Sequence, residues 1–468
     1  MNNVSPTRLQ NIDLDNINWE ICLPCLNLGV MYVLPSSTLE NFTTNKTMLH
    51  RPMTELEVGL YGSLSSAGAM VGTPIVAAIL DKLGRKTCTV LVGLTSVISW
   101  AILACTGRVE IVLFAIFVGG LGGASFLIVP VYCSEFCQES IRGTMTAGSM
   151  VFYGIGMLVS YLLGDFCSYI NMIYIALSLA TGSVISMIWL KESPTLLVQK
   201  GLKEKAAESI SFYRQVSTRS KLVLEELDTI HRSLNPLESD QIPEEEKLFS
   251  EEKMTKIEEK SQPTRRGLFI TLITITLTTF QGIIAVQVYL EPLFQKAVPT
   301  MSSTLCCLLF AVTIVVASVL AAWMSDLAGR RPLIIYSSIG SCICCVVLGT
   351  QMQFEWGPSW LTAVVLYVFC AVFSFGGGTV PFVLFAEMFL PEVKSFMTMV
   401  VVEWMWICCF LILIVFNPLA SLLGLGGVFH VFAGVCIATA VVSVIYVPET
   451  KGMTLDAVQV MLAERRNF

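Results

Sequence analysis

The sequence predicts an all-α membrane protein whose twelve transmembrane helices form two six-helix halves. Of the 468 residues, 54% are hydrophobic and 14% are charged, and the mean hydropathy is +0.71. Soluble domains carry roughly 25% charged residues, so this composition does not suit a water-facing surface of this size. Apolar runs long enough to cross a bilayer recur along the chain, and a set of charged motifs appears twice in the same order.

The apolar runs set the predicted domain boundaries. A helix needs about 20 apolar residues to cross the hydrocarbon core of a bilayer. The predicted domains are an N-terminal six-helix bundle (1–190), a cytoplasmic linker with short amphipathic helices (191–266), a C-terminal six-helix bundle (267–447) and a cytoplasmic tail (448–468). The twelve runs lie at 19–39, 56–79, 88–106, 111–133, 144–165, 170–190, 267–290, 303–324, 332–351, 360–386, 396–417 and 425–447.

The placement of Lys and Arg predicts the orientation, because basic residues favour the cytoplasmic side of a membrane. With the N-terminus inside, Lys46, Arg51, Arg108 and Lys296 fall outside and the other basic residues fall inside. We therefore expect a multi-pass protein of the cell membrane with both termini in the cytoplasm.

Two Asn-x-Thr sequons, at Asn41 and Asn45, fall in the first predicted outside loop, where we expect glycosylation.

The sequence gives little support to other functional classes. The net charge of −6 argues against a nucleic-acid partner, and most of the sixteen cysteines lie inside apolar runs, where they pack as small hydrophobic residues. The chain has no Walker loop and no HExxH motif. We therefore expect no enzyme activity, no metal site and no cofactor, while the lipid bilayer is the expected surrounding.

The repeated motifs carry paired charges at the predicted inner ends of helices. Partly desolvated ion pairs stabilise only the conformation that satisfies their geometry. They could therefore latch the cytoplasmic side as the halves move between two states. The positive-inside rule alone would explain the basic residues. It would not explain the acidic residues that lie at matching positions in both halves. The predicted gating residues are Asp81, Gly84, Arg85, Glu135 and Arg142 in the first half, and Asp326, Gly329, Arg330, Glu387 and Lys394 in the second.

Six short strings run in order through nearly all of the membrane part. They are DKLGRK, PVYCSEFCQESIRG, ESPTLL, SDLAGRR, PFVLFAEMFLPEVK and PETKG. In these strings the chain resembles the sugar-porter branch of the major facilitator superfamily, which includes glucose facilitators and insect trehalose transporters. The resemblance implies the major facilitator fold, alternating access, a central cavity between the halves and a small-molecule substrate, a sugar.

The resemblance also places the substrate site, and there the sequence departs from the family. Family positions with Gln, Asn or Trp become Met, Thr, Ile or Phe, while Tyr289 and Trp406 keep an aromatic ring. A hexose carries about five hydroxyls, and each one buried without a partner costs about 1–3 kcal/mol. We therefore expect a more apolar cavity than a glucose site. The predicted substrate-binding residues are Met150, Thr278, Thr279, Gln281, Ile284, Gln287, Tyr289, Phe382, Glu403 and Trp406.

Two of these residues have open alternatives. Gln281, on the helix face of Thr278, either restores an amide to the site, as Gln287 could, or makes an interhelical hydrogen bond. Glu403 is an intramembrane carboxylate, which is costly and usually faces a cavity or a partner. It would serve proton coupling or a cationic substrate, or else it lies near the cytoplasmic interface or pairs with a base such as Lys394.

The function that follows is facilitative transport of a hexose, trehalose or a polyol by alternating access. Two alternatives remain open. One is a transporter of a less polar or cationic solute, and the other is a transport-poor, sugar-transporter-like sensor. The sequence does not predict the oligomeric state.

Overall fold

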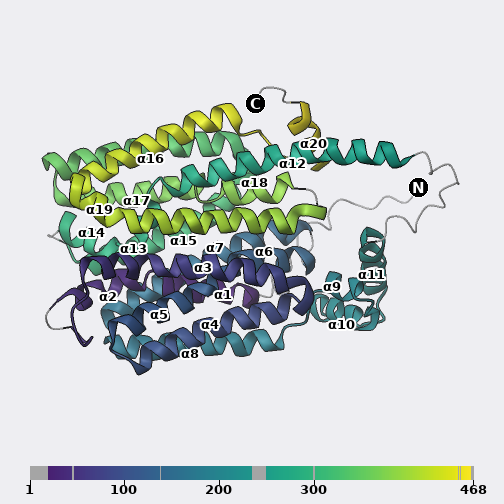
Figure 1. Ribbon diagram of the computed structural model, residues 1–468, viewed down its shortest axis with the longest axis horizontal. Helices are drawn as coiled ribbons and strands as arrows, with labels where there is room; N and C mark the ends of the chain where they lie inside the picture. Colours follow the sequence, from purple (N-terminus) through teal and green to yellow (C-terminus); the bar gives the residue numbers. More distant parts are fainter. Residues whose placement is uncertain are drawn as a thin grey trace.

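The computed structural model consists of helices arranged in two bundles that lie side by side (Figure 1). The purple-to-blue bundle is the N-terminal half, and the green-to-yellow bundle is the C-terminal half. The short helices that connect them lie at one end of the molecule, here called the linker end. The structure describes residues 19–44, 47–136, 139–234, 249–298, 301–389, 391–451, 453 and 455–464.

The N-terminal half and the linker follow the predicted order of helices. A short 3-10 turn, η3 (Trp19–Cys22), opens the described chain, and a second one, η4 (Leu121–Ala124), lies between α5 and α6. The helices of the first half are α1 (Leu23–Tyr32), α2 (Leu34–Thr43), α3 (Glu55–Leu83), α4 (Arg85–Cys105), α5 (Val109–Gly120), α6 (Ser125–Phe136), α7 (Glu139–Phe166) and α8 (Tyr169–Trp189). The linker helices are α9 (Pro194–Gln199), α10 (Lys203–Arg214) and α11 (Lys221–Leu234).

The C-terminal half repeats this order. The predicted start of this half at residue 267 falls inside α12, so the linker continues into the seventh span without a helix end. The helices are α12 (Phe249–Thr279), α13 (Ile283–Val288), α14 (Leu290–Ala297), α15 (Ser303–Ala328), α16 (Arg330–Phe354), α17 (Ser359–Phe375), α18 (Val380–Met388), α19 (Pro391–Tyr446) and, in the tail, α20 (Leu455–Glu464).

The predicted all-α membrane fold is confirmed. Within the described residues, nine ranges are long and apolar enough to cross a membrane. One of them, Phe396–Tyr446, bends at Gly424, where φ is 71°, and therefore contains two spans. The two remaining spans are α12–α14, which is interrupted, and α15, whose apolar part is Leu305–Ala321. Together these give the twelve predicted spans.

The helix contacts repeat in the two halves. In the first half α1 contacts α7, α3 contacts α5, and α4 contacts α8. The corresponding contacts in the second half are α12 with α19, α15 with α17, and α16 with α19. The halves meet through α3 with α19 and α7 with α15, and also through α2 with α14 at the end opposite the linker. This repetition agrees with a duplicated six-helix unit.

In the part of the chain that the structure describes, four spans are interrupted, namely the first, fourth, seventh and tenth. The first breaks at Val33, directly before the proline-containing first turn of α2, because proline suits the first turn of a helix and not its interior. The seventh breaks at 280–282, where Gly282 has a φ of 98° that favours glycine. Glycine-rich stretches also break the fourth span at 121–124 and the tenth at 376–379.

Helices α3 and α5 pack with their backbones in close approach. A Cβ atom added at Gly68 would overlap the backbone oxygen of Phe117, and one added at Gly120 would overlap that of Ser65. Small residues allow such close packing of membrane helices. A Cβ at Gly182 on α8, in contrast, would meet nothing within 4 Å.

Candidate functional site

Four aromatic rings close a cycle where the two halves meet. Tyr32 ends α1, Phe126 begins α6, Tyr153 lies on α7, and Trp406 comes from α19 of the other half. The ring centroids are 6.2 Å apart for Tyr32 and Tyr153 and 5.7 Å for Tyr153 and Phe126. They are 6.0 Å apart for Phe126 and Trp406 and 6.2 Å for Trp406 and Tyr32. We call these four residues the aromatic cluster.

The indole of Trp406 brings an unused hydrogen-bond donor to this cluster. Trp406 is 3% exposed, and no described residue offers an acceptor to its Nε1. The edge of its ring packs against Gly123, where a Cβ would lie 3.0 Å from the ring. The hydroxyl of Tyr32, in contrast, already has Ser66 Oγ as a partner at 3.3 Å. A buried donor without an acceptor costs about 1–3 kcal/mol, so Trp406 Nε1 is suited to bind a polar atom of a bound molecule.

The polar residues predicted on the seventh span are engaged elsewhere. Because α12 ends at Thr279, Gln281 lies in the break, where its backbone nitrogen donates to the backbone oxygen of Thr278 at 3.3 Å. Its Nε2 donates to Ser338 Oγ on α16 at 3.2 Å, which is the interhelical alternative. The hydroxyl of Thr278 donates to the backbone oxygen of Thr274 at 2.9 Å. Gln281 thus makes the interhelical hydrogen bond, and a contact of its amide with the substrate stays a prediction.

Replacing Gln281 with alanine is expected to lower stability by about 1 kcal/mol and to leave the affinity for a transported solute unchanged. The physical reason is that the variant loses one buried hydrogen bond inside the second half. Thermal melting of the detergent-solubilised protein and the KM of uptake measure the two effects. A large rise in KM would show that the amide contacts the solute.

The other predicted substrate residues lie around the same core. The ring of Tyr289 stacks on Phe416 with centroids 5.2 Å apart and an interplanar angle of 9°. The backbone oxygen of Gln287 accepts a hydrogen bond from the hydroxyl of Tyr161 at 2.9 Å. Thr279 is buried. The half-buried side chains packed against the core that contains Trp406 include Met150, Ile284 and Phe382.

Glu403 lies three residues before Trp406 on α19 and is half-buried. Its Oε2 is buried, and no hydrogen-bond partner for it occurs among the described residues. The side chain of Lys394, the predicted alternative partner, lies outside the described residues. Glu403 therefore stays a candidate for contact with a cationic group.

The gating motif of the first half forms a compact charged site at the linker end. Arg85 is 8% exposed, and its guanidinium lies 2.8 Å from Glu135 Oε1 and 2.9 Å from Asp81 Oδ1. Glu192 Oε1 accepts hydrogen bonds from the backbone nitrogens of Arg85 and Lys86, at 2.8 and 3.2 Å. A carboxylate suits this position because the first backbone N–H groups of a helix have no partner within it.

The second half repeats this site. Arg330 Nη2 lies 2.9 Å from Glu387 Oε1. Glu449 accepts hydrogen bonds from the backbone nitrogens of Arg330 and Arg331, at 3.0 and 3.2 Å. Gly329 has a φ of 88°, and a Cβ there would lie 2.7 Å from the Glu449 carboxylate. Gly84, with a φ of 101°, meets Glu192 in the same way, so both glycines make room for a carboxylate.

The capping roles of Glu192 and Glu449 were missed from the sequence, although each follows the sixth span of its half in a repeated motif. The ion pairs between described side chains lie within one half or within the linker. A latch between the halves stays a prediction.

Some of the predicted site residues lie outside the described residues. These are the side chains of Arg142, Asp326 and Lys394 and the sequon at Asn45, whereas Asn41 is exposed near the end of α2.

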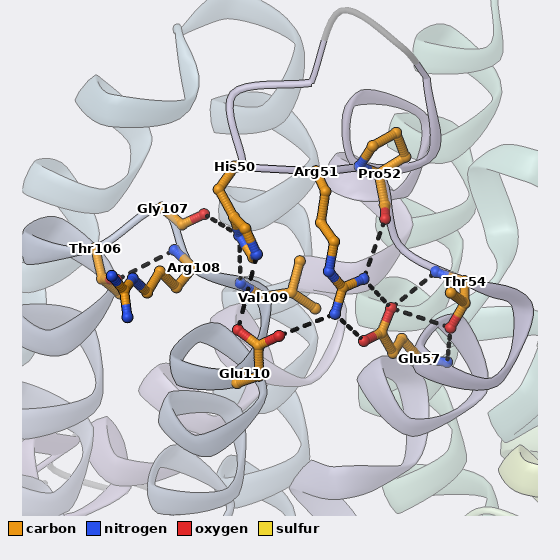
Figure 2. A network of polar contacts seen from close by, with 10 residues as sticks. All are labelled: His50, Arg51, Pro52, Thr54, Glu57, Thr106, Gly107, Arg108, Val109 and Glu110. Atoms are coloured by element: carbon orange, nitrogen blue, oxygen red, sulfur yellow. Dashed lines mark hydrogen bonds and ion pairs between the residues drawn. The ribbon is translucent and has the colours of Figure 1, made fainter.

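A second network closes the opposite end of the first half (Figure 2). Arg51 donates to both carboxylate oxygens of Glu57, at 2.7 and 2.6 Å, and to Glu110 Oε1 at 2.9 Å. Thr54 and Glu57 form a capping box at the start of α3. His50 Nδ1 accepts from the backbone nitrogen of Val109 at 3.3 Å. These contacts hold the loop before α3 against the start of α5.

Comparison with known proteins decides the family. The model of the family described as "Sugar (and other) transporter" matches residues 27–462. The chain belongs to this family. The members of this family are transporters and not enzymes. The partner that they share is a small-molecule substrate, which they bind within the membrane.

Two insect relatives and two solved structures illustrate the match. The facilitated trehalose transporter Tret1 of Culex quinquefasciatus is 25% identical over 425 residues, which are 88% of this chain and 80% of the relative. Trehalose transporter 1 of Drosophila melanogaster is 26% identical over 429 residues, again 88% of this chain. This chain covers only 48% of the Drosophila relative, so it spans about half of that protein's length.

Among solved structures, the proton:xylose symporter XylE bound to 6-bromo-6-deoxy-D-glucose has a TM-score of 0.73 at 20% identity. The match covers 95% of this chain and 98% of that structure. The partially occluded inward-open conformation of XylE from E. coli has a TM-score of 0.76 at 19% identity, over 94% and 99% of the two chains. At this identity the likeness establishes the major facilitator fold of this sugar transporter family member.

Proposed function

We propose that this protein carries a sugar such as a hexose, trehalose or a polyol across the cell membrane by facilitated diffusion, with alternating access. The observation that carries this proposal is the aromatic cluster, to which both halves contribute and in which Trp406 Nε1 has no acceptor among the described residues. Family membership supports the class of solute. Binding sites in transporters of repeated halves lie between the halves, next to interrupted helices, and Tyr32 and Phe126 flank two such interruptions.

The chemistry around the cluster favours a sugar with an apolar face. Ligand sites commonly combine aromatic walls with a few polar groups that fix orientation. Here the rings supply the walls, whereas the side chains of Gln281 and Thr278 donate hydrogen bonds to other residues of the protein. A sugar that presents its C–H face to the rings and one oxygen to Trp406 Nε1 satisfies this arrangement. The remaining hydroxyls would keep water as their partner.

We also propose that the linker end faces the cytoplasm, with both termini on that side. The positive-inside distribution supports this orientation. In the conformation described, the halves touch through α2 and α14 at the opposite end, and the described ion pairs of Arg85 and Arg330 at the linker end each lie within one half. Rocking of the halves about the aromatic cluster would then open the substrate site first to one side of the membrane and then to the other.

The test is uptake of labelled trehalose and glucose in oocytes that express wild-type protein or Trp406→Ala. Loss of the ring contacts and of the hydrogen bond together is expected to lower uptake efficiency roughly 10- to 100-fold. Trp406→Phe, which keeps the ring contacts, should lose less. Trp404→Ala is the matched control, because Trp404 is exposed and does not belong to the aromatic cluster. Its Nε1 donates to Thr276 Oγ1, and the two atoms are 2.8 Å apart.

Equal uptake by wild type and Trp406→Ala at equal surface expression would contradict the proposed site. A second candidate function is transport of an organic cation, which is favoured by the buried Oε2 of Glu403, since this atom has no hydrogen-bond partner among the described residues. Uptake of labelled tetraethylammonium that is lost in Glu403→Gln, together with no sugar uptake, would support this second candidate. No uptake of either solute at normal surface expression would indicate the transport-poor sensor.

A further inference from the structure

The helix that follows the last span, α20, lies against α12 at the linker end of the molecule (Figure 1). Its side chains Val458 and Leu462 are each 1% exposed. They belong to an apolar cluster that also contains Ile270 of α12 and Met388 of α18. An isolated helix of ten residues is marginal in water, so α20 depends on this packing for its structure.

Hydrogen bonds join α20 to two other helices of the second half. Gln459 Nε2 donates to the backbone oxygen of Met388, the last residue of α18, at 2.6 Å. Arg266 Nη1, on α12, donates to the backbone oxygens of Leu462 and Ala463 at 2.7 and 3.0 Å. The last carbonyl groups of a helix have no partner within it, and a cation beside them is favourable. Helix α20 therefore bridges α12 and α18.

Helix α18 is the linker-end part of the tenth span, and the break at 376–379 separates it from α17. Residues of such a break can absorb a change in direction, so a segment beyond it can swing. Helix α18 also carries the predicted gating residue Glu387, whose Oε1 pairs with Arg330. Its Oε2 accepts a hydrogen bond from the hydroxyl of Thr450 in the tail at 2.5 Å. The tail therefore holds both the end of this segment and its gating carboxylate.

We propose that α20 is a strap: docked on α12, it holds α18 and its Glu387 in one position, and its release frees the linker-end part of the tenth span to move. The helices that α20 chiefly packs against are α12 and α18, so the strap acts on the second half. It ties the linker-end segments of two interrupted spans, the seventh and the tenth, into one unit. This role deepens the proposed alternating access, because such a unit moves together with its half, but it does not depend on the solute.

The experiment is hydrogen–deuterium exchange of the full-length protein in lipid nanodiscs. No solute is added, so failure of the sugar proposal would not affect the result. Arg266→Met removes the charged donor that holds the end of α20. The backbone amides of α20 should then exchange roughly 10- to 100-fold faster, because hydrogen bonds to a charged group are lost. The amides of α18 should exchange faster together with them, whereas those of α17, the other part of the same span, should keep their wild-type rates.

A second variant releases the strap without changing α12 or α18. Val458→Asp places a charge in the apolar contact, which disfavours docking, and it should speed exchange in the same two helices. Arg265→Met is the matched control, because Arg265 is the exposed neighbour of Arg266 on α12. Peptides from α20 and α18 in this control should exchange as in wild type.

Three results would overturn the proposal. One is faster exchange of α20 in both variants with wild-type exchange of α18, because the tail would then hold nothing in place. Another is an equal increase in α18, α17 and α16, because the tail would then support the fold of the whole half and not one segment. The third is wild-type exchange of α20 itself in both variants.

Discussion

Replacing Arg85 with methionine is expected to destabilise the protein by about 3–5 kcal/mol, because the change leaves a buried carboxylate without its counter-ion. Arg85 is 8% exposed, and its guanidinium contacts both Glu135 and Asp81. Burial already raises the pKa of Glu135 above its ordinary value. Without the guanidinium, this carboxyl can bind a proton at low pH, so the loss of stability should grow as the pH rises. Thermal melting in detergent between pH 5 and 8 measures both effects.

Two variants test whether the burial of Arg85 is the cause. The double variant Arg85→Met with Glu135→Met removes both charges and should recover a large part of the lost stability. Arg51→Met at the opposite end is the matched control. Arg51 also contacts two carboxylates, but its side chain is 37% exposed and water screens its charge, so we expect a much smaller loss of stability. Equal destabilisation by Arg85→Met and Arg51→Met would refute the explanation.

Introducing alanine at Gly120 is expected to prevent correct folding of the first half or to lower its stability by about 3 kcal/mol or more. The added methyl group would overlap the backbone oxygen of Ser65 on α3, and backbone atoms cannot move aside as a flexible side chain can. Gly68→Ala would meet the backbone oxygen of Phe117 and should behave in the same way. The yield of monodisperse protein in size-exclusion chromatography and its melting temperature are the measurements.

Gly182→Ala provides the control for these glycine variants. Gly182 lies in the middle of a helix, as Gly68 does, but a Cβ there would meet no atom within 4 Å. Alanine has the higher helix propensity, so Gly182→Ala should be neutral or slightly stabilising. A similar loss of folded protein in all three variants would mean that the close approach of α3 and α5 is not the reason.

Much of the fold could be predicted because it depends on local properties of the chain. The hydrophobic runs and their lengths determine which segments cross a bilayer. The duplicated motifs predicted that Arg85 lies near Glu135 and Asp81, and the structure brings these three side chains together. For Gln281, two alternatives stayed open, because a sequence does not show which neighbour an amide meets across a helix interface.

The sequence by itself therefore determined the twelve spans, the two halves and the charged residues at their ends, since each follows from composition, run length and repetition. Only the tertiary structure decided where Trp406 meets Tyr32 and Phe126, and which carboxylate caps α4. The physical reason is that these contacts join residues far apart in the chain. Their partners depend on how the helices cross and where they break, and both are set by packing.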